Sequence, residues 1–340
     1  MAYTTINNGA SYFNTLLYTG NGSTLTVTGN SFQPDFTWIK ERSAAGNHKL
    51  ADVVRGTTKY LSSNLTDAED STGSGIQSWN STGFSLSNAT DINDSGQTYA
   101  AWNWLAANST TTNTSGSISS TVSVNTTSRF SIVSYTGTGS LGTVGHGLGV
   151  APNIIIVKSR SGAGQPWHIY TSMLGNTKAL FFDTSSAGTA SSWWNDTSPT
   201  SSVFTVNTSG GVNGNGATLI AYCFAEVKGY SKFGSYVGNG STNGPFIYTG
   251  FKPAFVMTKA SSTTGNWKIS WDSFSNGDDY NLAPNLSSAE GNANQIDLLS
   301  NGFKCRASDT DRNGSGTTYI YAAFAENPFV LTDGTPVTAR

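Results

Sequence analysis

Residues 98–104 read TYAAWNW, and two later stretches, TLIAYCF at 218–224 and TYIYAAF at 318–324, repeat the pattern. In each stretch the side chains alternate with a period of two, which is the period of a β-strand. An asparagine and a glycine before each strand supply the positive φ angles that tight hairpins require. These pairs are Asn93 and Gly96, Asn213 and Gly216, and Asn313 and Gly316. Near the strand ends, we expect an aromatic side chain to be buried in the core of its own repeat. The three aromatic residues are Trp104, Phe224 and Phe324.

A proline followed by an apolar run that ends in lysine also occurs three times. The runs are 34–40, 152–158 and 253–259. Lys158 follows Lys40 by 118 residues and Lys259 follows Lys158 by 101, so the spacing is nearly constant. Ordered anchors at steady spacing indicate an internal repeat, and units of this length are long enough to form small sandwiches. We therefore predict that the three lysines lie at equivalent positions in three units. The units run over 12–106, 129–228 and 232–327.

Composition supports an all-β chain. The 340 residues include 38 Gly, 9 Trp, 14 Tyr and 17 Phe, and only 11% are charged. Aromatic residues and threonine favour strands, whereas glycine and asparagine favour turns. The run Ile154–Val157 is apolar throughout, which is typical of a strand buried on both faces. The expected fold is three tandem antiparallel β-sandwich repeats, jelly-roll-like in character.

Three polar segments lie outside these units: an N-terminal arm (1–11), a Ser/Thr/Asn-rich linker (107–128) and a C-terminal tail (328–340). The linker and the tail have few apolar side chains to offset the entropy of ordering them. We expect neighbouring chains of a larger assembly to hold these two segments in place. The alternative, that both pack on their own chain, stays open.

Charge and apolar patterning exclude several classes of protein. A net charge of −2 without a basic stripe argues against nucleic-acid binding. A membrane span would need about 20 consecutive apolar residues, and the sequence has no such run. The first ten residues lack the pattern of a secretory signal. With only two cysteines, Cys223 and Cys305, we expect free thiols, with Cys305 buried.

Two motifs suggest a bound group, and neither has the required context. Asp309, Asp311 and Asn313 resemble the start of an EF-hand loop, but the twelfth position is Ile320 rather than a bidentate Glu. We keep these three residues as a calcium candidate and favour a hairpin turn. Gly137-x-Gly139-x-x-Gly142 matches a dinucleotide motif but precedes no helix, so we expect a glycine-rich turn and no cofactor.

Catalytic patterns are weak. The carboxylate clusters Asp67/Glu69/Asp70 and Asp278/Asp279 could serve glycoside cleavage, but both lie in expected loops. His48 and His168 occupy related positions near which the third unit has Trp267, so a structural role is favoured for them. His146 is the remaining histidine. We therefore predict no enzymatic activity.

Tryptophans in loops could stack on sugar rings, because their flat apolar faces match a pyranose. The candidates are Trp79, Trp167, Trp193 and Trp194. Packing in the core or between units is the favoured alternative.

Several motifs carry a resemblance to a known family. They are the opening Met1–Ile6, the run Tyr18–Ser23, the run Pro34–Arg42, the motif Asp52-Val53-Val54-Arg55-Gly56, the run Gly83–Leu86 and Tyr99–Trp104. The chain resembles a family of virion structural proteins of marine tailed bacteriophages, labelled tail-fibre-like or uncharacterised. The match covers the first unit closely and the other two more loosely, since these lack Arg55-Gly56 and the tryptophan pair. No catalytic residue comes with that family.

The resemblance implies a non-enzymatic virion structural protein, either decorating the capsid or forming a head or tail appendage. Its partners would be copies of itself and other virion proteins, after assembly in the bacterial host cytoplasm. Two alternatives remain: a carbohydrate-binding host adhesin that contacts surface glycans, and a glycan-degrading tailspike. Location on the capsid or the tail, and the oligomeric state, stay open.

Overall fold

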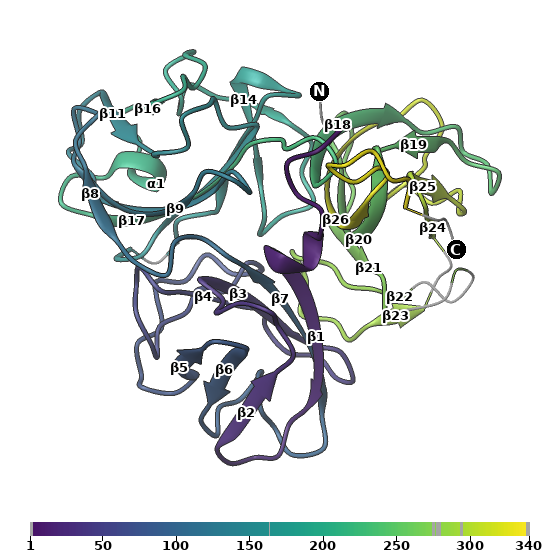
Figure 1. Ribbon diagram of the computed structural model, residues 1–340. Helices are drawn as coiled ribbons and strands as arrows, with labels where there is room; N and C mark the ends of the chain where they lie inside the picture. The colour runs from purple at the N-terminus through teal and green to yellow at the C-terminus, as the bar shows by residue number, and fades with distance from the viewer. Residues whose placement is uncertain (1–2, 163, 274–275, 277–279, 293–294, 338–340) are drawn as a thin grey trace.

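The computed structural model describes residues 3–162, 164–273, 276, 280–292 and 295–337. These residues form three β lobes arranged around a common centre (Figure 1), each with a main sheet and a small sheet. Within the described residues, no helix is long and apolar enough to cross a membrane.

The first unit is a sandwich of two antiparallel sheets. Its main sheet has the order β1-β7-β3-β4, and its small sheet has the order β2-β6-β5. The main strands are β1 (Phe13–Thr19), β7 (Thr98–Trp104), β3 (Phe36–Glu41) and β4 (Lys49–Asp52), and the small ones β2 (Leu25–Thr28), β6 (Gly83–Leu86) and β5 (Ile76–Asn80). A short 3-10 helix, η1 (Gly9–Ser11), precedes β1. Tyr99 and Ala101 of the main sheet pack against Phe84 and Leu86 of the small one, which makes the core of this unit.

The second unit repeats the four-stranded order as β10-β17-β12-β13 and extends it at both edges. These strands are β10 (Phe130–Thr136), β17 (Thr218–Phe224), β12 (Ile154–Ser159) and β13 (His168–Thr171). The extensions are β14 (Gly175–Phe181) and β15 (Thr189–Ala190) at one edge, and β9 (Ser120–Asn125) and β8 (Thr111–Asn113) at the other. The small sheet comprises β11 (Gly142–Gly145) and β16 (Val203–Val206), and α1 (Gly210–Asn213) is a single helical turn.

The third unit has the order β18-β26-β20-β21 in its main sheet and β19-β25-β24 in its small sheet. The strands are β18 (Ser231–Val237), β26 (Thr318–Pro328), β20 (Phe251–Ala260), β21 (Lys268–Trp271), β19 (Phe246–Tyr248), β25 (Gly302–Cys305) and β24 (Ile296–Leu299). A two-stranded ribbon joins β22 (Tyr280–Asn281) and β23 (Gly291–Asn292). The all-β fold with antiparallel sandwiches is thereby confirmed.

Strand registers make the three main sheets equivalent. Lys40 lies opposite Ala100, Lys158 opposite Ile220 and Lys259 opposite Ile320, always between the same two strands of the shared order. The aromatic positions follow the same rule, because Trp104, Phe224 and Phe324 lie opposite Phe36, Ile154 and Phe255. The repeat anchors in the sequence therefore mark the same point of the same strand.

The expectation that Trp104, Phe224 and Phe324 fill the cores of their own units is wrong. All three are buried, but they meet one another at the common centre, with ring centroids 5.6–6.2 Å apart. Along β7 the alternation sends Tyr99 and Ala101 into the first unit and Trp102 and Trp104 into the shared core. Each main sheet is therefore covered on both faces, which explains why the run Ile154–Val157 is apolar throughout.

Residues 107–128, predicted from their composition to be a flexible linker, instead form part of the second unit's main sheet. Residues 120–125 form β9, which pairs with β10, and residues 111–113 form β8, which pairs with β9. Ile118 and Val122 are buried in the core of the second unit, so two apolar side chains anchor an otherwise polar stretch. Backbone hydrogen bonds order the remaining polar residues of β8 and β9, because the unpaired edge of a sheet can pair with a strand of any sequence.

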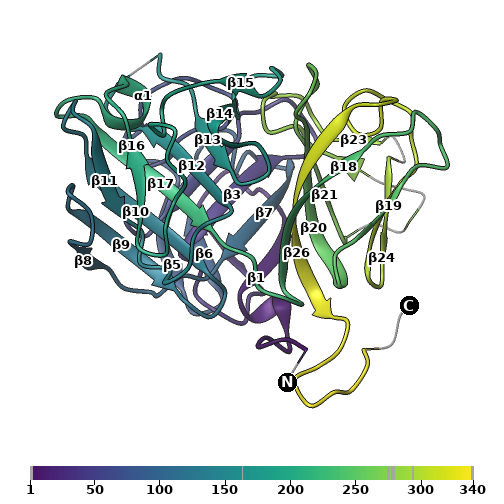
Figure 2. The same ribbon diagram turned by 90° about the horizontal axis from the view of Figure 1, so that it is seen from above.

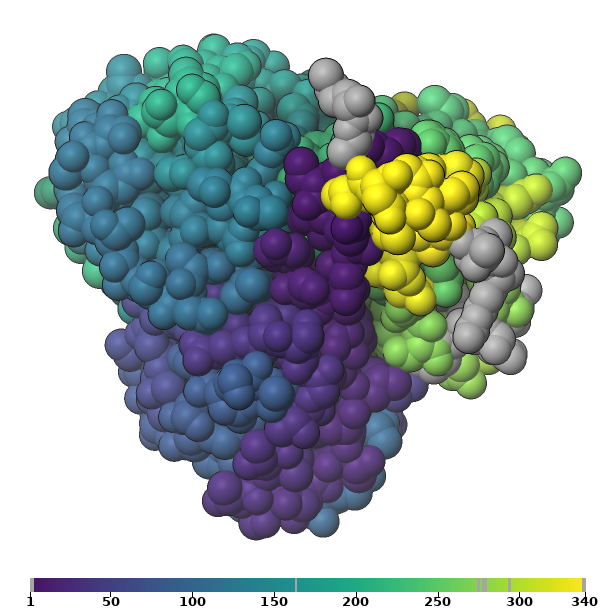
Figure 3. All heavy atoms as spheres, viewed as in Figure 1, coloured from purple at the N-terminus to yellow at the C-terminus, as the bar shows by residue number. Residues whose placement is uncertain are grey.

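The two ends of the chain hold each other. Asn7 of the arm accepts from the backbone N–H of Thr332 at 2.6 Å and donates to the Thr332 hydroxyl at 2.7 Å. Ile6 is buried in the shared core. Figures 2 and 3 show the arm running beside the last strand and the tail. The arm and the described part of the tail are thus joined by hydrogen bonds within this chain.

Candidate functional site

Each unit sends a loop onto the next unit, and we call these loops straps. The first strap is 62–69, the second is 181–188 and the third is 283–290. The first strap lies on the second unit, the second on the third, and the third on the first. The contacts therefore run in a closed cycle, as three separate subunits of a ring would make them.

The same backbone hydrogen bonds recur at all three junctions. A glycine N–H donates to the middle of the strap at 2.9–3.0 Å: Gly164 to Thr66, Gly265 to Ser185 and Gly46 to Ser287. The last strap residue returns a bond at 2.8–2.9 Å: Glu69 to Arg160, Gly188 to Ser261 and Glu290 to Arg42. Two bonds per junction satisfy backbone groups that would otherwise be buried without partners.

An aromatic ring N–H anchors the start of each strap. The indoles of Trp167 and Trp267 donate to the carbonyls of Ser62 and Phe181 at 2.8 and 2.7 Å. In the first unit His48 takes this position, with Nε2 3.0 Å from the carbonyl of Ala283. Register thus aligns His48 with Trp167 and Trp267, and His168 lies one position further on, which corrects the alignment expected from sequence.

His48 is held neutral with its proton on Nε2. The indole of Trp38 donates to Nδ1 at 2.9 Å, so Nδ1 must be the acceptor and Nε2–H must donate to Ala283. Burial and, to a smaller extent, the nearby charge of Lys40 lower the pKa of His48 to about 3. The neutral His48 ring therefore donates to a strap carbonyl as Trp167 and Trp267 do. Both of its nitrogens are hydrogen-bonded, so neither is free for catalysis.

The three equivalent lysines are buried beneath the straps. Lys158 donates to the carbonyl of Thr66 at 2.9 Å, and Lys259 donates to that of Ser185 at 3.2 Å, so each ammonium holds the strap of the preceding unit. Lys40 donates to the carbonyl of Glu41 at 2.6 Å. Burial lowers the pKa of all three to about 8.

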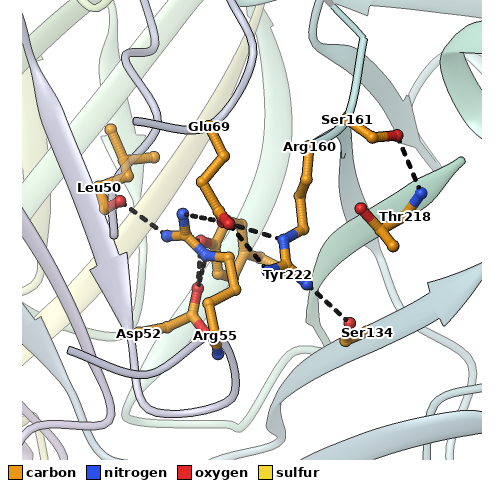
Figure 4. A network of polar contacts seen from close by, with 9 residues as sticks. All are labelled: Leu50, Asp52, Arg55, Glu69, Ser134, Arg160, Ser161, Thr218 and Tyr222. Atoms are coloured by element: carbon orange, nitrogen blue, oxygen red, sulfur yellow. Dashed lines mark hydrogen bonds and ion pairs between the residues drawn. The ribbon is translucent and has the colours of Figure 1, made fainter. Parts of the chain in front are cut away.

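Ion pairs reinforce the first and third junctions, and the first has the larger network. At the third junction Arg42 donates to both carboxylate oxygens of Glu290 at 2.9 Å. At the first, Glu69 accepts from Arg160 at 2.8 and 2.9 Å in a bidentate pair and from Arg55 at 3.2 Å (Figure 4). Arg55 is fully buried and also bonds Asp52 at 2.5 Å and the hydroxyl of Tyr222 at 3.1 Å. Burial alone would raise the pKa of Glu69, but the two arginines outweigh it and hold that pKa below its ordinary value. The network thus joins two units by a chain of charges.

The calcium candidate is a turn in the loop that crosses from β25 of the small sheet to β26 of the main sheet, so the favoured hairpin is wrong. Asn313 is fully buried; its amide accepts from Asn239 N–H at 2.9 Å and donates to the carbonyls of Ser241 and Ala307. Asn93 and Asn213 make the equivalent bond in the other units. Asp311 is paired with Lys268 at 3.4 Å, and Asp309 accepts from the backbone N–H of Asp311. Within the described residues no group of three or more His, Cys, Asp or Glu could hold a metal.

The tryptophan candidates are divided. Trp167 and Trp194 are buried in cores, so they cannot stack on a glycan, and the favoured alternative of core packing applies to both. Trp193 is half-buried and its ring packs edge-on against His168, with centroids 4.5 Å apart. Trp79 is half-buried against the core of the first unit.

The remaining candidates have structural partners or lie elsewhere. Of the carboxylates, Glu69 belongs to the charge network, Asp70 accepts from the backbone N–H of Thr72, and Asp67 is exposed. Asp278 and Asp279 lie outside the described residues. His146 bonds the carbonyl of Thr200 at 3.2 Å. Cys223 and Cys305 are free and buried, as expected. Gly139 has a φ of 69° and lies between β10 and β11, which confirms the turn.

One open groove of about 440 Å³ lies where the N-terminal arm meets the third unit. The residues that line it are Tyr3, Glu226, Lys228, Ser231, Lys232, Tyr248, Thr249 and Gly250. Tyr3 donates to the carbonyl of Gly250 at 2.7 Å, and its oxygen lies 3.4 Å from the hydroxyl of Tyr248. The ammonium of Lys228 lies 4.4 Å from the centre of the Tyr3 ring. Sequence reasoning missed this groove, because its parts come from three separate segments.

The fold defines a class: a single chain of three sandwich units, closed by a cycle of straps around one aromatic core. The chain belongs to a family described as a domain of unknown function, DUF7483, whose model matches residues 8–328 and so spans all three units. No curated protein matches the chain.

Proposed function

We propose that this protein is a non-enzymatic structural component of a bacteriophage particle, carried on the capsid or on an appendage. One observation carries the proposal: the three units are locked into one body by a shared core and by three equivalent junctions. Buried charge and polar groups are used to join units, as in Glu69 with Arg160 and Lys158 with Thr66. Such a body transmits force and presents three related faces, which suits a part that docks where symmetry-related copies meet.

The motifs shared with virion proteins of tailed phages support the location. Among these motifs, the stretch Asp52–Gly56 supplies the buried Arg55 of the first junction, so a part of the resemblance has a structural role. The glycan-degrading alternative gains no support from Glu69, because two arginines neutralise that carboxylate, and Asp52, the other carboxylate of the network, is buried and paired with Arg55.

Mapping a purified particle tests this proposal. Particles from host cells that express the gene with a small exposed tag should carry the tagged chain after density-gradient purification. Their cryo-electron microscopy map should hold density for a three-lobed body. A chain that stays in the lysate and is missing from purified particles would refute the particle role.

A further inference from the structure

The groove at the third unit breaks the repeat. By register, Tyr248 on β19 corresponds to Thr28 in the first unit and to Gly145 in the second. Tyr248 is 54% exposed, so a large aromatic ring stands in solvent where the sister units have a threonine and a glycine. Burial does not account for this ring, and the ring lines an open groove together with Lys228 and Glu226, which makes the position a candidate contact site.

Tyr3 of the N-terminal arm lines the groove together with Tyr248, and contacts with two glycines fix the position of the arm. Tyr3 reaches the carbonyl of Gly250 because that residue has no side chain: a Cβ there would lie 2.7 Å from the Tyr3 oxygen. At Gly229 a Cβ would lie 2.8 Å from Thr4, the next residue of the arm. Both glycines have a positive φ, 83° and 80°, so the backbone at these points favours glycine. The arm is therefore seated against the third unit and closes one side of the groove.

The charges in the groove do not balance. The ammonium of Lys232 is paired with Glu226 at 2.9 Å, whereas Lys228 pairs with no carboxylate in the described part of the chain. Two cations and one carboxylate leave a net charge of +1, which fits one anionic group on a ligand. Glu226 would repel a phosphate dianion but can accept from hydroxyl groups.

We propose that this groove binds one acidic sugar residue, a hexuronate within a polysaccharide. The ring of Tyr248 offers a flat apolar face to the C–H face of the pyranose, Lys228 pairs with the carboxylate, and Glu226 accepts from a hydroxyl. A volume of about 440 Å³ lies within the range of small-ligand sites and accommodates one such residue with its neighbours directed to solvent. The inference does not rest on the particle role, and it concerns residues outside the four tryptophans expected to bind glycans.

Saturation-transfer NMR on the full chain tests the proposal with trimers of galacturonate, glucuronate and mannuronate. At least one trimer should receive saturation and give a dissociation constant, and its methyl ester, which is neutral, should bind at least tenfold more weakly. Absence of saturation for all three trimers, or equal binding of acid and ester, would overturn the inference.

Variants localise the site. Tyr248→Ala should weaken binding at least tenfold, and Lys228→Gln should reduce the preference for acid over ester to near unity. Phe246→Ala is the matched control: Phe246 is 46% exposed on the same strand and does not line the groove, so binding should persist. Unchanged melting temperatures establish that each variant folds. Wild-type affinity in Tyr248→Ala, or loss of binding in Phe246→Ala, would place the sugar elsewhere and overturn the assignment.

Discussion

At the junction between the first and second units, Glu69 of the first strap meets Arg160; at the junction between the second and third, the equivalent residues are Gly188 and Ser261. The backbone bond between these two positions is the same, 2.9 Å in both cases. The second junction therefore closes without the ion pair, through backbone bonds, the indole of Trp267 and the ammonium of Lys259. The difference shows that hydrogen bonds to the strap backbone suffice to join two units, and that the ion pairs of the first and third junctions add to these bonds.

The buried pair of Arg55 with Asp52, which lies beside the first junction, should make that junction the most sensitive one. Arg55→Met should lower the free energy of unfolding by about 3–5 kcal/mol, because Asp52 would be left buried without its cation. Urea unfolding at pH 7 measures this loss. As a control, Arg160→Met should cost less, since its side chain is partly exposed and Glu69 keeps Arg55. Equal losses in the two variants would show that Arg55 does not hold the network together.

Acid should affect the first junction through Glu69. Glu69→Gln should cost about 1.5–3 kcal/mol at pH 7, the range for hydrogen bonds to charged groups. Because the pKa of folded Glu69 lies below its ordinary value of 4.5, its stabilising contribution is present above pH 4.5 and is lost as the pH falls through the folded pKa. The variant should therefore lose less stability than the wild type between pH 5 and acid. Parallel stability curves in urea titrations at several pH values would contradict this assignment.

The indole donors Trp167 and Trp267 should contribute equally to the stability of the first and second junctions. Trp167→Phe and Trp267→Phe each remove one indole N–H that donates to a strap carbonyl, at a cost of about 1 kcal/mol for the hydrogen bond. Differential scanning calorimetry should show one cooperative transition, shifted by similar amounts in both variants. A second transition in either variant would mean that its units unfold independently, and the shared core would then not couple them.

The last prediction concerns the pH dependence that the buried lysines give to stability. Their pKa of about 8 lies below the ordinary value of 10.5, so the unfolded chain binds more protons between these values and stability should rise from pH 8 to pH 10. Above pH 10 the buried tyrosines, whose pKa is raised, act in the opposite direction. Lys158→Met should flatten the rise measured by urea unfolding at pH 7.5 and 9.5. A slope identical to that of the wild type would show that Lys158 is not the group that titrates.

Part of the sequence pattern of the three straps repeats along the chain and could have been recognised from the sequence. Asn64-Leu65 and Ala68-Glu69 recur in the third unit as Asn285-Leu286 and Ala289-Glu290, and the second unit keeps Ala187 before Gly188. The asparagines have a matching role, because each accepts from the backbone N–H of the ring donor, at 3.1 Å for His48 and 3.0 Å for Trp267. Sequence reasoning passed over this signal because it lies in loops, where hydrophobic periodicity gives no guide.

The groove could not be found in this way. Tyr3, Lys228 and Tyr248 are far apart along the chain, and no spacing rule connects them. Their proximity depends on the arm crossing to the third unit.

The sequence by itself determined the all-β class, the position of the equivalent lysines and the strand that each unit contributes to its main sheet. These features follow from local chemistry: a period of two, turn residues with positive φ, and constant spacing between anchors. Only the tertiary structure decided that Trp104, Phe224 and Phe324 meet at one centre, and that residues 107–128 complete the sheet of the second unit. Alternation predicts that two faces of a strand differ, but not which partner covers each face. That choice depends on how the three sheets close around one another, because the apolar face of each sheet is buried only when the other two are in place.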